Sequence, residues 1–377
     1  MESIKVLIID ENVLVRRAIT NVLNNYDVFE VCWLADRSQN ITEVVEQNYP
    51  DVILLSIDDM ESPGFTILSS LRMSFPNLPI IAITPRSDEG AEAAINALRL
   101  GALDFISKPA HNNLILFAER HLEKRLGPII KAAKKIRERS HLNDEILKSL
   151  VHPQKTFEQI SSDPISGTSA ELVVMGGCTG GTQTLFSLLS ALPGNLDVPV
   201  VIVQHLPRIY TRYLALKLDS VSDVSVREVQ DGVLLEDGEV WLAPGGYQCE
   251  IGLSGYQKVL KTHRGMRENN MRPSIDILFR SAAKVYGKKT LGILLSGCGY
   301  DGLSGAEDIR NVGGQIIVQD PRTAIAAELP LAAIRNGLTQ EYYSPEEIAS
   351  EITKRTERTR ETTVEEEEKA VGKSFIF

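Results

Sequence analysis

The sequence predicts an α/β protein with two parallel-sheet domains. Short apolar runs of the β type alternate with helix-length amphipathic segments through the first 125 residues. The same alternation resumes at Leu172, after a polar and turn-rich stretch. Strands that alternate with helices form parallel sheets covered on both faces. Because such sheets carry their sites at the carboxyl ends of the strands, the polar residues that follow each strand are the first candidates for function.

Composition narrows the class of protein. The chain has 377 residues, of which 43% are hydrophobic and 24% charged, as in ordinary globular domains. A formal net charge of −10 argues against general nucleic-acid binding, which requires a basic surface. We find no apolar run of the ~18 residues that a membrane span needs, and no signal-peptide pattern at the start. Four cysteines without a C-x-x-C pair indicate reduced thiols, so we expect a cytoplasmic protein without membrane insertion.

The first section alternates five expected strands with amphipathic helices. The strands are expected at residues 6–9, 29–33, 52–55, 80–83 and 105–106, and the first helix at residues 13–24. Polar residues follow four of the five strands, and in chain order they are Asp10, Glu11, Ser56, Thr84 and Lys108. In this order the positions resemble the phosphorylation site of the receiver domains of two-component response regulators. The resemblance covers nearly all of residues 1–125.

The receiver resemblance implies a role for each position. In that family an acidic pair binds Mg²⁺, an Asp after the third strand accepts phosphate, and a Thr or Ser and a Lys contact the phosphoryl group. The matching residues are Asp10, Glu11, Thr84 and Lys108, with Asp10 and Glu11 as the candidate Mg²⁺ ligands. Ser56 takes the place of the phosphoacceptor, and Asp59 is a rival acceptor in a register shifted by three residues. Since a hydroxyl substitutes poorly for a carboxylate ligand, we expect that ordinary aspartyl phosphorylation does not switch this domain.

Residues 126–169 are expected to form a linker. A basic and then mixed amphipathic helix is predicted over residues 129–150, followed by a polar segment with several turn residues. A basic patch could bind an acidic partner, but a solvated linker helix is the preferred interpretation.

The second domain opens with a strand, a tight turn and a helix. An apolar run at residues 172–175 is followed by an expected turn that holds Gly176, Gly177, Gly180 and Gly181, after which helical spacing resumes. Cys178 falls in this turn. The unpaired N–H groups and positive dipole at a helix N-terminus favour an anion such as a thiolate there. A glycine-rich connection with an inert thiol is the alternative.

Two more residues complete a candidate triad with Cys178. Further strands are expected at residues 198–203, 290–295 and 314–318, and the first two of these are followed by His205 and Asp301. On a parallel sheet the three side chains could face one crevice as nucleophile, base and orienting carboxylate. A structural histidine and a turn aspartate are the alternatives. A nucleotide-binding turn is less favoured, because the Gly-Lys-Ser/Thr of a P-loop is absent.

Seven ordered segments resemble the catalytic domain of the chemotaxis protein-glutamate methylesterases, the CheB family. They are Gly176–Thr182, Val203–Pro207, Leu242–Gly246, Arg272–Phe279, Gly297–Gly302, Gln319–Asp320 and Leu329–Pro330. The resemblance covers about residues 170–350 and implies a Ser-His-Asp triad. His205 matches its base and Asp301 its orienting acid, while Cys178 stands where the family has serine. Two neighbours also differ, because Cys298 replaces a Met and Gln248 replaces a His.

The resemblance implies a function and its partners. We expect a methylesterase that acts on methyl-accepting chemoreceptors in adaptation, needs no cofactor for ester hydrolysis, and also deamidates glutamines less well. A chemotaxis histidine kinase is a further partner that the receiver allows. Backbone N–H groups around Cys178 and Cys298 are candidate oxyanion donors, and Thr179, Gln248 and Cys298 are expected to line the site. The alternative function is a catalytically silent module that binds receptors.

Two smaller hypotheses remain from the sequence. Cys178 and Cys298, with His205 and Asp301, could form a zinc set or a redox-sensitive thiol pair, although no local ligand spacing supports this. The highly charged segment at residues 351–377 is expected to be a disordered solubilising tail, with a docking peptide as the alternative.

Overall fold

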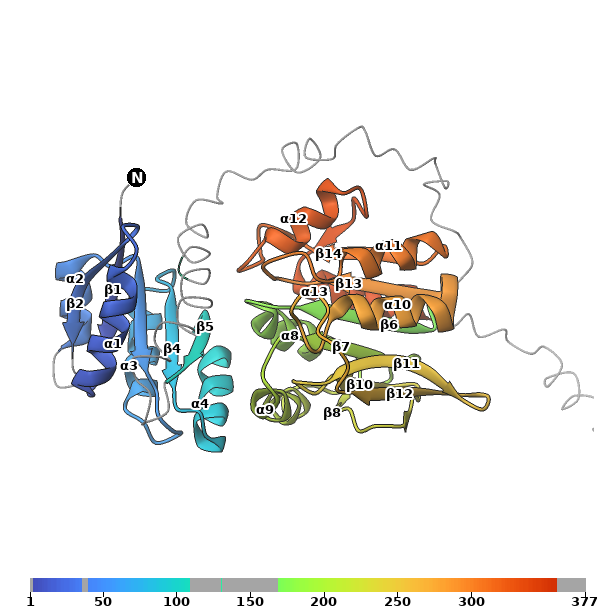
Figure 1. The fold of residues 1–377 in the computed structure, drawn as a ribbon, viewed down its shortest axis with the longest axis horizontal. Helices are drawn as coiled ribbons and strands as arrows, with labels where there is room; N and C mark the ends of the chain where they lie inside the picture. Colours follow the sequence, from blue (N-terminus) through green and yellow to red (C-terminus); the bar gives the residue numbers. More distant parts are fainter. Residues whose placement is uncertain (1–2, 36–39, 109–129, 131–168, 358–377) are drawn as a thin grey trace, which may run out of the picture.

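The computed structural model describes residues 3–35, 40–108, 130 and 169–357. The predicted linker helix, apart from Ile130, and residues 358–377 of the predicted tail lie outside these residues. The tail prediction was wrong for residues 351–356, which belong to a helix over Pro345–Thr356 whose Ile352 and Thr356 side chains are buried. Figure 1 shows two α/β domains, one coloured blue to cyan and the other green to red. No helix in the described ranges combines the length and the apolar character that a membrane crossing demands.

The first domain contains a five-stranded parallel sheet in the order β2-β1-β3-β4-β5. Its strands are β1 (Ile4–Ile9), β2 (Phe29–Ala35), β3 (Val52–Ser56), β4 (Ile80–Thr84) and β5 (Asp104–Ser107), and its helices are α1 (Val13–Asn24), α2 (Ile41–Asn48), α3 (Gly64–Ser74) and α4 (Asp88–Arg99). Every residue of β3 and β4 is buried, which explains their continuous apolar runs. The α/β prediction for this domain is confirmed, and each strand bound lies within two residues of its expected place.

The second domain is built on a seven-stranded parallel sheet in the order β15-β14-β13-β6-β7-β10-β8. The strands are β6 (Leu172–Gly177), β7 (Val200–Gln204), β8 (Ser225–Glu228), β10 (Glu239–Leu242), β13 (Thr290–Leu294), β14 (Gln315–Gln319) and β15 (Tyr342–Tyr343). Alternate residues of β6 enter two different cores. Val173 and Met175 pack with helices α8 (Gly181–Ser190), α9 (Arg208–Asp219) and α13 (Pro345–Thr356) on one face.

Leu172 and Val174 pack on the other face, with helices α10 (Ile275–Tyr286), α11 (Leu303–Asn311) and α12 (Glu328–Arg335). The sheet is therefore covered on both sides, as the alternating sequence pattern predicts. A separate antiparallel sheet of β9 (Val233–Leu234), β11 (Gln248–Ser254) and β12 (Gln257–His263) was not predicted.

The prediction for the first glycine pair was wrong. Gly176 and Gly177 do not lie in a turn but end strand β6, where they pair with β7 and β13. The reason is the packing of helix α10, because a Cβ on Gly176 would lie 2.4 Å from Cγ2 of Ile275. Only a residue without a side chain lets the first turn of α10 approach the strand so closely.

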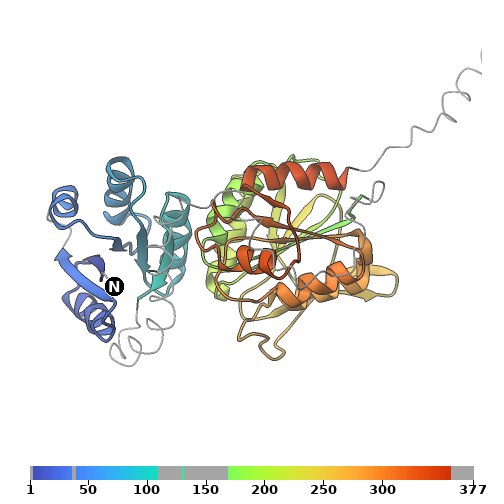
Figure 2. The same cartoon turned by 90° about the horizontal axis from the view of Figure 1, so that it is seen from above.

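The two domains contact each other through α4 and β5 of the first and α8 and α9 of the second (Figure 1 and Figure 2). Gln183 in α8 donates from Nε2 to the carbonyls of Ala102 and Leu103 at 2.6 and 2.8 Å. The rings of Phe105 and Tyr210 lie 4.4 Å apart, and the Tyr210 hydroxyl is 2.6 Å from Oγ of Ser107. Ser107 precedes Lys108, so the contact reaches the strand end that carries the receiver's lysine.

Candidate active site

The turn that carries Cys178 is fixed by hydrogen bonds at its backbone. The N–H of Cys178 donates to the carbonyl of Ser296 at 2.9 Å, and Nε2 of Gln204 donates to the carbonyl of Cys178 at 2.6 Å. Oγ of Ser296 donates to the carbonyl of Thr179 at 2.8 Å. Gln204 and Ser296 are both buried. The thiol therefore projects from a rigid turn between β6 and α8, as a positioned nucleophile requires.

His205 follows β7 and lies beside Asp301. Its backbone N–H donates to the carbonyl of Gly177 at 3.0 Å, and the ring nitrogen Nε2 is 2.8 Å from Oδ2 of Asp301. The side chains of His205 and Asp301 are only 7% and 4% exposed. The other ring nitrogen, Nδ1, is buried and aligned with no hydrogen-bond partner in the described residues. The structure thus brings together the base and the acid that lie 96 residues apart in sequence.

Asp301 sits in a cradle of donors at the start of α10. It accepts hydrogen bonds from Oγ of Ser274 at 2.7 Å, the N–H of Ile275 at 2.8 Å and Nδ2 of Asn269 at 3.0 Å. Burial alone would raise the pKa of this carboxyl. The hydrogen bond and charge of His205, with Asn269 and Ser274, outweigh burial and hold the pKa of Asp301 at about 2. The carboxylate is therefore charged and fixed in place.

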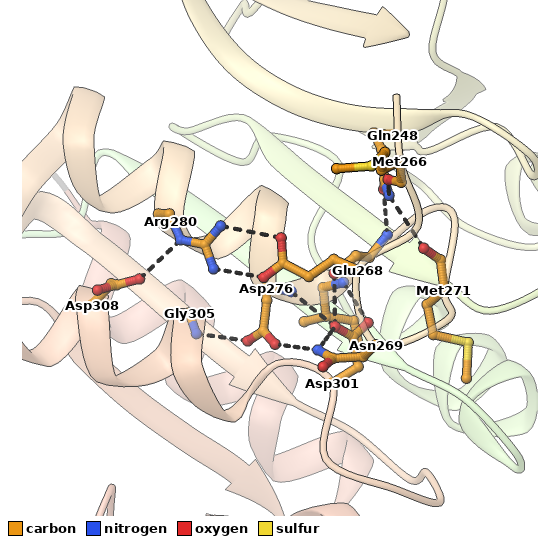
Figure 3. A network of polar contacts seen from close by, with 12 residues as sticks. Gln248, Met266, Glu268, Asn269, Met271, Asp276, Arg280, Asp301, Gly305 and Asp308 are labelled. Carbon is orange, nitrogen blue, oxygen red and sulfur yellow. Dashed lines mark hydrogen bonds and ion pairs between the residues drawn. The ribbon is translucent and has the colours of Figure 1, made fainter. Parts of the chain in front are cut away.

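A second buried acid lies next to Asp301. Figure 3 shows Asn269 between the carboxyl groups of Asp276 and Asp301. Nδ2 of Asn269 donates to Oδ2 of Asp276 at 2.7 Å, and the N–H of Gly305 donates to the other oxygen at 2.7 Å. Burial and the charge of Asp301 raise the pKa of Asp276 to about 6. Sequence reasoning assigned no role to Asn269, Ser274 or Asp276, because only the tertiary fold brings them to Asp301.

The electrostatics around Cys178 favour a thiolate paired with an imidazolium. Burial raises the pKa of the thiol, but contact with His205 and the N–H groups of Thr179 and Cys298 lowers it more, so the net shift is downward. Burial lowers the pKa of His205, while Asp301 and Cys178 raise it to about 9. A loosely aligned hydrogen-bond contact between His205 and Cys178 contributes to both shifts together with charge, and Nδ1 is the ring nitrogen that Asp301 leaves open to it.

The candidate oxyanion donors are the backbone N–H groups of Thr179 and Cys298. Both N–H groups lie close enough to the Cys178 sulfur to help lower the pKa of its thiol, which is why they are the candidates. The N–H of Cys178 itself cannot take this role, because it already donates to Ser296. The sequence-based set of donors around positions 178 and 298 is therefore narrowed to two.

Gln248 does not line the site, and this part of the prediction is wrong. Its side chain is fully buried. Its Nε2 donates to the carbonyls of Met266 and Met271 at 2.9 and 3.2 Å, and its Oε1 accepts from the N–H of Ser274 at 2.8 Å. All of its polar atoms are thus committed, and no donor remains for an oxyanion. Gln248 instead holds the loop that carries Asn269 and Ser274 against Asp301.

Cys298 is a poor metal ligand in this setting. Burial, the charge of Glu328 and that of Cys178 raise the pKa of its thiol to about 12, so it stays protonated. In the part of the chain that the structure describes, no three His, Cys, Asp or Glu side chains are grouped to hold a metal ion. The geometry therefore gives no support to the zinc hypothesis.

Selective alkylation tests the thiolate at Cys178. At neutral pH we expect iodoacetamide to modify Cys178 before Cys298 and Cys249, because burial and nearby charges raise the pKa of the latter two to about 12. Peptide mass spectrometry after timed quenching measures each site. In His205→Ala the Cys178 rate at neutral pH should fall, since the cation that stabilises the thiolate is gone. Equal rates at the three sites would contradict this electrostatic arrangement.

The receiver positions meet at the carboxyl ends of β1, β3, β4 and β5. Nζ of Lys108 lies 3.1 Å from Oδ2 of Asp10 and 2.5 Å from Oδ1 of Asp58. Ser56 is buried, and the Thr84 hydroxyl is buried without a partner in the described residues. Asp58 is thus an acid after β3 that reaches the lysine, and sequence reasoning missed it because it considered only Ser56 and Asp59 as acceptors.

These receiver residues do not fit Mg²⁺ as the family pattern implies. Ser56 supplies a hydroxyl where the pattern has a carboxylate ligand, and the Lys108 ammonium already neutralises Asp10. Asp59 is also accounted for, because its Oδ1 accepts from the N–H of Glu61 at 2.9 Å. The predicted metal ligands Asp10 and Glu11 consequently lack the third acid of a binding set among the described residues.

Comparisons with known proteins agree along most of the chain. A family profile described as CheB methylesterase matches residues 173–352, and one described as response regulator receiver domain matches residues 6–118. The protein-glutamate methylesterase/protein-glutamine glutaminase of Trichodesmium erythraeum is 35% identical over 356 residues, which is 94% of this chain and 99% of that protein. The protein of the same name from Pyrococcus abyssi is 32% identical and covers 95% of both chains.

A solved structure adds a further likeness. The crystal structure of the Thermotoga maritima CheB methylesterase catalytic domain is 32% identical, covers 49% of this chain and 98% of its own, and has a TM-score of 0.48. The identity and coverage of the full-length relatives carry the assignment. With its receiver domain followed by a CheB methylesterase domain, the chain belongs to the protein-glutamate methylesterase/protein-glutamine glutaminase family.

Proposed function

We propose that this protein hydrolyses glutamate methyl esters on chemoreceptors, with Cys178 as nucleophile, His205 as acid and base, and Asp301 as the residue that orients His205. The observation that carries the proposal is the His205–Asp301 pair at 2.8 Å, buried beside a thiol whose pKa is lowered. The names of the full-length relatives agree with this reaction.

The proposed reaction has two steps. The Cys178 thiolate attacks the ester carbonyl carbon, and the N–H groups of Thr179 and Cys298 stabilise the oxyanion that forms. When the C–O bond breaks, the His205 imidazolium gives its proton to the departing oxygen, so that methanol leaves and a thioester remains on Cys178. His205 then takes one proton from water as the water oxygen attacks the thioester, and the C–S bond breaks to return the thiolate. The glutamic acid side chain that is released gives its remaining proton to solvent.

Sulfur at position 178 is expected to favour esters over amides. Thiolate is a good leaving group, so a tetrahedral intermediate formed from glutamine tends to expel Cys178 rather than the amine. A serine alkoxide is a poorer leaving group, so the tetrahedral intermediate on serine returns to the glutamine substrate less readily. The family's second activity, on glutamine, is therefore expected to be weaker here than the first.

Methanol and ammonia release test both statements. With receptor that carries methylated glutamates and unmodified glutamines, we expect the native protein to release methanol, and its methanol-to-ammonia ratio to exceed that of Cys178→Ser. Equal ratios in the two proteins would contradict the leaving-group argument. Methanol release by Cys178→Ser but not by the native protein would mean that sulfur in place of oxygen at position 178 inactivates an otherwise intact site. Silence from both would favour the catalytically silent receptor-binding module.

A further inference from the structure

Two arginines share one tyrosine beside the candidate active site. Nη1 of Arg208 lies 3.2 Å and Nη2 of Arg264 lies 3.1 Å from the Tyr247 hydroxyl oxygen. The two guanidinium carbons also lie 5.1 and 5.0 Å from the centre of the Tyr247 ring. Both arginines are exposed, whereas Tyr247 is partly buried. The hydrogen bond from Arg264 and the charges of both arginines lower the pKa of the Tyr247 phenol.

Within the described part of the chain, neither Arg208 nor Arg264 forms an ion pair with an acid, and both guanidinium groups donate instead to the Tyr247 hydroxyl. Two like charges held at one oxygen repel each other, and an anion between them would remove that repulsion. The planar guanidinium group matches a carboxylate in a bidentate arrangement.

Two of these residues, Arg208 and Tyr247, border a cleft of about 740 Å³. Arg208, Arg212 and Tyr247 are among its lining residues, as are three acids. The acids are engaged elsewhere. Glu228 accepts from Thr211 at 2.6 Å, Asp231 accepts from the N–H of Thr262 at 2.7 Å, and Asp88 bonds to the Tyr213 hydroxyl. These hydrogen bonds hold the three acids in place without removing their charge, so the cleft carries both signs, and Arg208 and Arg212 are the cations that line it.

The arginine pair is tied to both partners of Cys178. Arg208 lies three residues after His205, so their Cα atoms are at most about 11 Å apart. The Tyr247 turn packs on that segment, because a Cβ on Gly245 would lie 2.4 Å from the backbone N of Arg208. Arg264 begins the loop that continues to Asn269 and so to Asp301, and its carbonyl accepts from Nη1 of Arg272 at 3.2 Å.

We propose that Arg208, Arg264 and Tyr247 form a carboxylate-binding subsite that recognises an acidic residue of the protein substrate close to its esterified glutamate. This inference rests on the proposed function, because that reaction turns neutral esters into glutamate carboxylates on the same substrate segment. The chain carries a net charge of −10 and would repel such a segment, whereas the two guanidinium groups at Tyr247 supply local positive charge. An acid within one or two helical turns of the ester matches the distance from His205 to Arg208.

A pair of peptides tests the subsite. Each carries one glutamyl methyl ester, and the positions three and four residues to either side are Glu in one peptide and Gln in the other. We expect the native protein to show about tenfold higher kcat/KM on the acidic peptide, as two partly exposed charge pairs allow. In the double variant Arg208→Gln/Arg264→Gln this preference should fall to near one, and added salt should reduce it in the native protein.

Arg227→Gln is the matched control, since it removes an exposed arginine of β8 that pairs with Glu239 of β10. It should keep the preference for the acidic peptide. Equal kcat/KM on the two peptides for the native protein, or an unchanged preference in the double variant, would overturn the subsite.

A binding assay separates this inference from the proposed function. If the native protein cleaves neither peptide, the esterase proposal fails, and fluorescence anisotropy with glutamine in place of the ester still decides the subsite. Tighter binding of the acidic peptide that is lost in Arg208→Gln/Arg264→Gln supports it. Equal binding of the acidic and neutral peptides refutes it.

Discussion

Replacing Cys178 with alanine is expected to lower kcat for ester hydrolysis by at least roughly a thousandfold. The variant keeps His205, Asp301 and the two N–H donors of the candidate oxyanion hole but has no atom that can form the thioester. The backbone bonds that fix the turn do not involve the sulfur, so the fold should persist. Methanol release from a methylated receptor, with the unfolding temperature as a check on folding, measures the effect.

Cys32→Ala is a matched control for this experiment. Cys32 lies in β2 of the receiver, and burial raises the pKa of its thiol, so its loss should leave methanol release within about twofold of native. A Cys178→Ala protein that still releases methanol near the native rate would exclude cysteine as the nucleophile.

Replacing Asp301 with asparagine is expected to lower kcat roughly a thousandfold to ten-thousandfold. The carboxylate accepts from His205, Ser274, Ile275 and Asn269, and its charge supports the imidazolium. An amide is neutral and places an NH₂ group among these donors, so the ring loses both its orientation and its stabilising charge.

The pH dependence distinguishes this loss from simple unfolding. With the pKa of His205 raised to about 9, native kcat/KM should fall as the pH rises through about 9, because the leaving oxygen then finds no proton donor. In Asp301→Asn the residual activity should already begin to fall at a lower pH than in the native protein, because the imidazolium has lost the carboxylate that stabilises it. Asp308→Asn, on the surface of α11, should retain both the native rate and the native pH profile. A native profile in Asp301→Asn would contradict the orienting role.

The strands could be predicted from sequence because a strand that is buried on both faces consists mainly of consecutive apolar residues. In β3, β4, β6 and β13 every residue is buried, and each strand is accordingly a mainly apolar run. The antiparallel pair β11 and β12 was missed because its residues are mixed in polarity and partly exposed. The glycine pair that ends β6 misled the prediction, since its cause is the approach of Ile275 from 99 residues further on.

The site was predictable only where a strand end carries the functional group. Cys178 and His205 follow β6 and β7 directly, so the parallel sheet predicts their proximity. The partners of Asp301 come from a loop with no periodic pattern, and nothing local marks Asn269 or Ser274 as its ligands. Gln248 was misassigned for the same reason, because its buried amide is committed to that loop.

The most direct test of the account is the mass of the protein quenched during turnover. A peptide with one glutamyl methyl ester is mixed with the native protein, stopped in acid after a fraction of a turnover, and digested for mass spectrometry. We predict that the Cys178 peptide carries the acyl group as a thioester that hydroxylamine removes, and that Cys178→Ala carries none. Methanol release without any acyl group on Cys178, or with the acyl group on another residue, would contradict the assignment of Cys178 as the nucleophile.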